Sequence, residues 1–275
     1  MHRGKGSYAL RFYLALVLFV ILAPMVILLF WTFTSRWPWP HLYPATLSLR
    51  GIEELFAPHA KVLPVLLSSI GLSLAVAFLS AIVATMTARA LVFYDFPGKR
   101  WIDLLGMAPI LVPSSVFAMG IHVVLIRMSL ADTMSGVILV HLIYTLPYTT
   151  NIMKDLTHSI GKQMEDQAYV LGVSPWKAFF HVSLPLISPG ILASISMAYV
   201  VSFSQYFITL LIGGGKVRTF STLMVPFIGK GDRTLGSAYG LVFILSTLIV
   251  FMVINQIIRL LPYQKKGVDS NWNSN

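Results

Sequence analysis

Long apolar runs separated by short charged segments dominate the pattern of this chain. Six windows contain no Asp, Glu, Lys or Arg: residues 12–35, 62–88, 104–126, 133–153, 178–215 and 234–258. Each reaches the roughly 20 residues with which a helix crosses about 30 Å of hydrocarbon, and lipid offers the backbone no hydrogen-bond partner outside a helix. The pattern predicts an all-α, polytopic membrane protein with six transmembrane helices in a single domain, residues 1–275. The expected spans are, in approximate numbers, 10–34, 64–88, 103–127, 134–153, 186–212 and 236–260.

The first window is too long for a secretory signal and lacks a small-residue cleavage site before Arg36, so it predicts an uncleaved first span. Aromatic side chains interleaved with prolines follow it. These aromatic residues are Trp37, Trp39 and Tyr43. They fit a belt at the outer membrane interface that leads into a non-helical loop.

Composition narrows the picture further. The chain is 56% hydrophobic and only 11% charged, which is too few charges to cover a globular core with polar surface. The formal net charge is +10, but the basic residues are scattered through loops, which favours anionic membrane lipid over nucleic acid as their partner. The absence of cysteine excludes disulfides, thiolate metal sites and cysteine nucleophiles.

Loop charges set the expected orientation. If the N-terminus is cytoplasmic, twelve of the 20 Lys and Arg residues fall on the cytoplasmic side. This modest bias agrees with the positive-inside rule and puts both termini and the long polar break between the fourth and fifth windows in the cytoplasm.

The polar break, about residues 160–185, predicts two short helices joined by a tight corner. The first helix ends at Gly172, which can adopt a left-handed conformation, and the second starts with Ser174 as N-cap and Pro175 at its first position. Pro185 and Pro189 would then fix the entry into the fifth span. The corner is expected to expose an apolar face made of Val170, Leu171, Trp176 and Phe179. Such a face either folds back on the bundle or is buried in another protein.

The same segment carries a spaced motif. Asp166-Gln167-Ala168 is followed after three residues by Gly172 and after nine more by Val182, Leu184 and Pro185. This resembles the EAA motif of ABC importer permeases, with Asp166 in place of Glu and Gln167 in place of the first Ala. Glu165 stands beside Asp166 and could substitute for it in part. The resemblance covers the chain from about Ser68 onward, and the segment from Ser202 to Phe207 is also similar.

The resemblance implies a type I ABC importer permease fold in a bacterial inner membrane. It also implies several partners: a dimer of cytoplasmic ABC ATPases that uses ATP and Mg, a second permease subunit, identical or related, and an external solute-binding protein. The two short helices would form the coupling element, with Asp166 orienting the first helix, Ala168 allowing close approach and Gly172 making the corner. Its expected coupling residues are Glu165, Asp166, Ala168, Leu171, Gly172, Val173, Trp176, Phe179, Leu184 and Pro185. The similarity is greatest to permeases for polyamines, phosphonates, thiamine and ferric iron, although Ser204 and Gln205 replace an acid and argue against a cationic substrate.

Sequence features that are absent from this chain indicate that any ATP hydrolysis takes place in another subunit. No Gly-x4-Gly-Lys-Ser/Thr sequence is present to hold ATP phosphates, so this chain is expected to bind no cofactor and to have no enzymatic activity of its own. The windows contain no Asp, Glu, Lys or Arg, which disfavours the alternative of an ion-coupled secondary transporter; His122 and His141 are the titratable side chains well inside them, and lone histidines there are more often packing residues than proton relays. A scaffold that only docks a cytoplasmic enzyme is a third interpretation.

Candidate pathway groups are polar or small side chains in the third to fifth spans. They are Ser114, Ser115, His141, Asn151, Ser204 and Gln205. Any one of them could instead be an ordinary contact between helices, because Ser and Gln commonly hydrogen-bond between membrane helices. The segment from Gly213 to Leu235 is expected to be a charged outer loop facing the binding protein.

Overall fold

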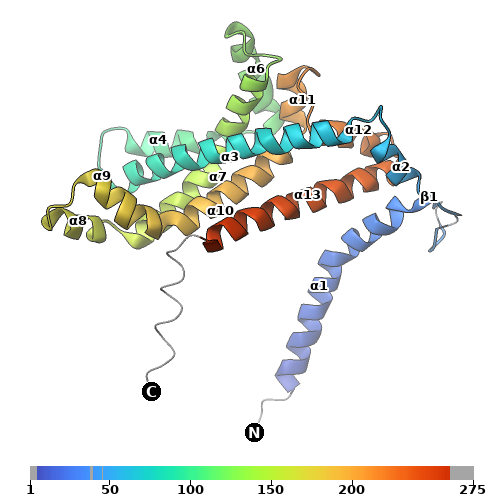
Figure 1. Ribbon diagram of the computed structural model, residues 1–275, viewed down its shortest axis with the longest axis horizontal. Helices are drawn as coiled ribbons and strands as arrows, with labels where there is room; N and C mark the ends of the chain where they lie inside the picture. The colour runs from blue at the N-terminus through green and yellow to red at the C-terminus, as the bar shows by residue number, and fades with distance from the viewer. Residues whose placement is uncertain (1–4, 38–39, 45, 261–275) are drawn as a thin grey trace. The chain divides into compact units, whose positions relative to one another are not determined.

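A computed structural model describes residues 5–37, 40–44 and 46–260 (Figure 1). Trp39 and the two chain ends, residues 1–4 and 261–275, lie outside the described residues, so their expected places are not addressed. The chain divides into two compact units. The first is built from the chain up to Leu63 and Leu223–Ser246, and the second from Pro64–Thr222 and the chain from Thr247.

The first unit contains α1 (Lys5–Thr32), α2 (Arg50–Phe56) and the start of α13 (Arg233–Leu260). A short antiparallel pair, β1 (Thr34–Arg36) and β2 (Thr46–Leu47), follows α1, in the place where the sequence predicted a non-helical loop. Trp37 stacks on Trp31, with ring centroids 5.1 Å apart. The expected first span is confirmed as a long apolar helix, from Leu10 to Thr32.

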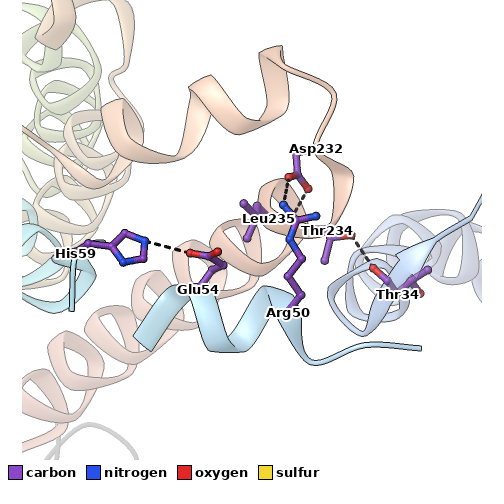
Figure 2. Close-up of polar contacts among 7 residues, drawn as sticks. All are labelled: Thr34, Arg50, Glu54, His59, Asp232, Thr234 and Leu235. Carbon is purple, nitrogen blue, oxygen red and sulfur yellow. Dashed lines mark hydrogen bonds and ion pairs between the residues drawn. The ribbon is translucent and has the colours of Figure 1, made fainter. Parts of the chain in front are cut away.

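Polar contacts tie α2 to the start of α13 (Figure 2). Arg50 Nη2 lies 2.8 Å from Asp232 Oδ2, and Asp232 Oδ1 accepts the backbone N–H of Leu235 at 3.1 Å, which caps α13. Thr234 Oγ1 donates to the carbonyl of Thr34 at 2.6 Å. Asp232 is therefore engaged within its own unit.

The prediction of an outer loop from Gly213 to Leu235 is wrong, because this segment contains the helix α12 (Phe220–Gly229). Before that helix, Lys216 Nζ lies 3.3 Å from Asp132 Oδ2. The segment is mostly apolar between Phe220 and Ile228, which is why it folds as a helix instead of staying in solvent.

The second unit contains most of the helices in the described part of the chain. In chain order these are α3 (Val62–Phe93), α4 (Lys99–Gly106), α5 (Ala108–Leu111), α6 (Ser114–Arg127), α7 (Met134–Ile160), α8 (Gln163–Val170), α9 (Pro175–Ala178), the π-helical turn η1 (Phe179–Ser183), α10 (Leu184–Phe203) and α11 (Phe207–Gly213). Small buried residues on α3, Ser73, Ala77, Ala84 and Ala88 among them, let neighbouring helices approach closely, as is usual between membrane helices.

Five helices of the described residues are long and apolar enough to cross a membrane: Leu10–Thr32, Val62–Phe93, Met134–Ile160, Pro175–Phe203 and Arg233–Ile257. The third expected span, 103–127, is not one helix, because Val112 is extended before Pro113 and separates α5 from α6. Proline disfavours a helical conformation in the residue before it. The six-helix count is thus not confirmed as continuous helices.

The fifth expected span, 186–212, differs at both ends. Its helix starts earlier, at Pro175, and stops at Phe203, after which Ser204–Tyr206 separate α10 from α11. Pro185 and Pro189 are therefore not the entry to the span but lie at the start and inside α10. Since proline fits the first turn of a helix, Pro185 fits the junction where η1 passes into α10.

Candidate functional site

The two-helix corner in the polar break has the expected geometry. Gly172 has φ +79°, a left-handed conformation that favours glycine. The N–H of Val173 donates to the carbonyl of Ala168 at 3.0 Å and that of Gly172 donates to the carbonyl of Tyr169 at 2.9 Å. This pair of bonds is a Schellman motif, which satisfies the last carbonyls of α8. We call residues 163–178 the elbow.

Three large apolar side chains stand out from the elbow. Val170 is 87% exposed, Leu171 83% and Trp176 76%. Trp176 stacks with the exposed Phe180, whereas the expected exposed residue Phe179 is half-buried and packs against the cluster formed by Ala84, Ala88, Met153 and Ile187. The expected apolar face is therefore confirmed for three residues and wrong for Phe179. The reason is that η1 continues α9 without a break, which turns Phe179 inward.

The acidic pair of the motif is divided between two environments. Asp166 is exposed, and its only close cation among the described residues is Lys162, 3.8 Å away. Glu165 is buried, with 3% of its surface exposed, although the motif spacing assigns the acidic position to Asp166. Ala168 is buried, while Leu184 and Pro185 are half-buried in α10 and Val173 is half-buried beside the corner.

Glu165 is held by three side chains. Arg89 Nη1 lies 2.8 Å from Glu165 Oε1 and Arg89 Nη2 donates to Oε2 at 3.0 Å, which makes a two-pronged ion pair. Ser183 Oγ also donates to Oε1. Tyr169 completes the set with a long hydrogen bond to Oε2, at 3.4 Å.

Burial of Glu165 raises the pKa of its carboxyl, but the hydrogen bonds and charge of Arg89 and the bond from Ser183 outweigh it, so that this pKa lies below its ordinary value. The carboxylate is therefore ionised at neutral pH. A depressed pKa contributes stability above the ordinary carboxyl pKa, and that contribution is lost as the pH falls through the lowered value.

Arg89 and Ser183 are the residues that sequence reasoning missed. Arg89 follows an uncharged run of residues 62–88 and resembles the basic residues that usually end a membrane span. The pairing with Glu165 was not predicted because the two residues are 76 positions apart in the sequence. The available signal was the acidic pair Glu165-Asp166 in a segment expected on the same side of the membrane as Arg89.

A second polar set lies inside the helix bundle of the second unit. His141 is buried, with Nδ1 2.9 Å from Ser202 Oγ and Nε2 3.0 Å from Thr209 Oγ1. Ser202 Oγ donates to Ser73 Oγ at 3.3 Å, and Thr209 Oγ1 donates to the carbonyl of Gln205 at 2.9 Å. These bonds join α3, α7, α10 and α11. His141 thus satisfies its ring nitrogens within the bundle.

The other pathway candidates do not gather around His141. Ser114, Ser115 and Ser204 are exposed, and Gln205 is half-buried with its carbonyl accepting from Thr209 and from Ser221. Asn151 lines a cavity of about 110 Å³ between α3, α4 and α7. The structure therefore does not bring the six candidates together in one place.

We expect the substitution His141→Ala to lower the free energy of unfolding by about 2–4 kcal/mol, because it leaves a cavity and two hydroxyl groups without their partner. Thermal unfolding of the purified permease in detergent measures this loss. Ser204→Ala is the control: Ser204 is exposed and bonds only to the carbonyl of Val201 in its own turn, so the change should stay within about 0.5 kcal/mol. Equal melting temperatures for wild type and His141→Ala would contradict the structural role.

Comparisons with known proteins agree with the fold. The family model for binding-protein-dependent transport system inner membrane components matches residues 79–262. A crystal structure of a bacterial ABC transporter involved in the import of the acidic polysaccharide alginate covers 93% of this chain and 98% of its own, with a TM-score of 0.68. At 13% sequence identity, this likeness shows the fold alone.

Relatives in sequence include three transport permeases. The probable sulfate transport system permease protein cysT of Marchantia polymorpha is 24% identical over 226 residues, 74% of this chain and 73% of that protein. The putative 2-aminoethylphosphonate transport system permease protein PhnV of Salmonella typhi is 23% identical over 249 residues, 89% and 93% of the two chains. The molybdate/tungstate transport system permease protein WtpB of Thermococcus kodakarensis is 30% identical over 146 residues, 52% and 59% of the two chains.

The family match covers more than half of the chain, and it includes the Arg89–Glu165 ion pair, the elbow and all of α13. Proteins of this family are transport permeases and not enzymes. In an ABC system a separate subunit hydrolyses the ATP. This chain belongs to the family of binding-protein-dependent transport system inner membrane components, the permease subunits of type I ABC importers.

Proposed function

We propose that this permease forms half of the translocation pathway of an ATP-driven importer and is coupled to a cytoplasmic ATPase through the elbow. The observation that carries the proposal is the exposed triad of Val170, Leu171 and Trp176 on a corner that a Schellman motif holds rigid. Contiguous apolar side chains exposed in this way mark a protein interface. Large aromatic side chains are typical anchors of such interfaces.

The complete importer would contain two permease subunits, a pair of ATPases and an external solute-binding protein. Family membership implies the ATPase and the binding protein, and the number and identity of the permease copies are our extension. In this arrangement α4, α5 and α6 together supply the remaining crossing, the third in chain order, as three helices interrupted at Met107 and at Val112–Pro113. Both termini and the elbow would lie in the cytoplasm, in keeping with the distribution of Lys and Arg.

The substrate proposed here is a small oxyanion. The relatives carry the names of sulfate, molybdate or tungstate, and 2-aminoethylphosphonate permeases, and all of these solutes present a tetrahedral oxyanion group. The apolar windows of this chain hold no Asp or Glu that would attract a cation to the pathway. Exposed Ser114, Ser115 and Ser204 are the hydroxyl groups offered for such a pathway.

Uptake should depend on ATP. We expect proteoliposomes that contain the whole importer, with the ATPases facing the lumen and the binding protein outside, to take up radiolabelled sulfate, molybdate or 2-aminoethylphosphonate only when ATP and Mg are enclosed in the lumen. A proton or sodium gradient alone should give no uptake, because the apolar windows carry no Asp, Glu, Lys or Arg and the buried His141 is bonded to Ser202 and Thr209 within the bundle. The measurement is the initial rate with each energy source.

A matched control uses the same vesicles with a non-hydrolysable ATP analogue. Uptake driven by an ion gradient without ATP would reject the proposed coupling and favour a secondary transporter. Uptake of a polyamine in preference to all three oxyanions would reject the proposed substrate class while leaving the coupling intact.

A further inference from the structure

One buried carboxylate joins the elbow to a membrane span. Glu165 lies on α8, Arg89 in the last turns of α3 and Ser183 at the end of η1, so that three elements meet at a single side chain. Arg89 and Glu165 are 76 residues apart in sequence. The side of α8 that carries Glu165 and Ala168 is buried, whereas Val170 and Leu171 at its end are exposed.

The guanidinium of Arg89 is fixed on more than one side. Its Cζ lies 5.2 Å from the ring centroid of Phe93 and 5.0 Å from that of Phe179. Both prongs of the guanidinium reach the two oxygens of Glu165. A planar fork that meets a carboxylate with two bonds fixes direction as well as distance, which a single lysine charge does not. The pair therefore restricts rotation of α8 about the end of α3.

Stability alone does not explain such a pair. Replacing a buried ion pair with apolar side chains of similar volume is often neutral or stabilising, because both charges lose their water. The ion pair between Lys154 of α7 and Asp103 of α4 is more exposed at the carboxylate. The Arg89–Glu165 pair combines a buried carboxylate, two bonds between the same two side chains and a further bond from Ser183, an arrangement that fixes the orientation of α8 relative to α3.

We propose that Arg89 and Glu165 are positioning residues that make the elbow and α3 move as one body. A displacement of the elbow by a docked ATPase is then passed directly to α3, in addition to the path through η1 into α10. This inference rests on the proposed docking of the elbow. It assigns a mechanical role to Arg89, which the motif does not include.

The test compares conservative changes in the pair with a change in an exposed carboxylate outside the elbow. Glu165→Gln removes the charge and keeps the volume, Arg89→Lys keeps the charge and removes the fork, and Asp95→Asn, which breaks the exposed ion pair with Lys99, is the control. In the whole importer in proteoliposomes, we expect the ATP hydrolysed per labelled sulfate transported to rise about tenfold for each pair variant, a typical size for an allosteric coupling. Asp95→Asn should leave the ratio within about twofold, because exposed ion pairs contribute little. An unchanged ratio in both pair variants would overturn the inference.

A second measurement does not depend on the solute. Because the chain has no cysteine, spin labels can be placed by Met86→Cys on the exposed side of α3 and Gln167→Cys on α8. In the otherwise unchanged importer we expect one narrow distance between the labels, the same with and without ATP. With Arg89→Lys the distribution should broaden and change with nucleotide. Two results would overturn the inference that the pair joins α8 to α3. One is a narrow distance distribution with Arg89→Lys, and the other is a distance that changes with nucleotide while Arg89 is unchanged.

Failure of the underlying docking gives a different result. If the elbow does not bind an ATPase, the permease will not co-purify with one, whatever residue stands at position 89. If the ATPase co-purifies and the pair variants still couple normally, only the joint is wrong. Should a pair variant fail to assemble, Ser183→Ala removes one supporting bond without leaving a charge unpaired, and we expect the ratio to rise about threefold. An unchanged ratio there would also count against the joint.

Discussion

Replacing Trp176 with alanine should weaken binding of the permease to its ATPase by about 30-fold or more, the effect of losing an interface anchor worth at least about 2 kcal/mol. The side chain is 76% exposed in the isolated chain, so its truncation removes little packing within the permease. Its stacking with Phe180 presents a broad apolar surface beside Val170 and Leu171. Two measurements would detect the loss. One is the amount of ATPase that co-purifies with the permease, and the other is the dissociation constant for ATPase binding to immobilised, detergent-solubilised permease.

Trp101→Ala is the matched control for this prediction. Trp101 lies on α4, is 70% exposed and differs from Trp176 chiefly in its place outside the elbow. Both variants should insert and melt like the unchanged permease, since neither side chain is buried. Equal loss of ATPase binding in the two variants, or none in Trp176→Ala, would contradict docking at the elbow.

The corner of the elbow was predictable because its signals are local. Gly172 is needed where φ is positive, and Pro175 fits the first position of a helix, so both act on their own backbone. The apolar runs likewise predicted the long helices, since crossing a bilayer depends on length and composition. Each of the first, second, fourth and sixth expected spans coincides over most of its length with a long apolar helix in the structure.

Features that depend on contacts between distant segments were not predictable in the same way. The motif spacing assigns its acid to Asp166, but the buried acid is Glu165, because only Glu165 faces Arg89 on α3. The turn η1 joins α9 to α10 and turns Phe179 inward, where α3 and α7 receive it. A wider helical turn of this kind has no simple sequence signature, although such turns are frequent at functional sites.

The expected pathway around His141 shows the same limit. A histidine inside a membrane span suggested a polar route, yet the ring nitrogens are taken up by Ser202 and Thr209 from other helices. Polar residues at similar expected depths in the membrane therefore do not have to line the same cavity. In contrast, the exposed residues Ser114 and Ser204 lie next to interruptions of the helices, at the first position of α6 and directly after α10. Interrupted helices are common beside transport pathways.

The substitution Gly136→Ala should be among the most destabilising single-methyl changes in the second unit. A Cβ at Gly136 would lie 2.0 Å from the carbonyl oxygen of Leu130, which is backbone and cannot swing away. That carbonyl already accepts the hydroxyl of Thr133 at 2.7 Å, and Thr133 in turn caps α7 by accepting the N–H of Gly136 at 3.0 Å. One methyl group therefore pushes apart both the turn and the cap.

We expect this methyl group to lower the free energy of unfolding by about 3 kcal/mol, in the upper part of the range for overpacking. The amount of folded permease found in the membrane should fall as well. Gly120→Ala on α6 is the control, because its Cβ would meet no atom within 4 Å. Alanine is the better helix former, so that variant should be unchanged or up to about 1 kcal/mol more stable. Thermal unfolding in detergent compares the two directly. If they melted together, the close approach of Leu130 to α7 would be wrong, and with it the local geometry that starts α7 at Met134.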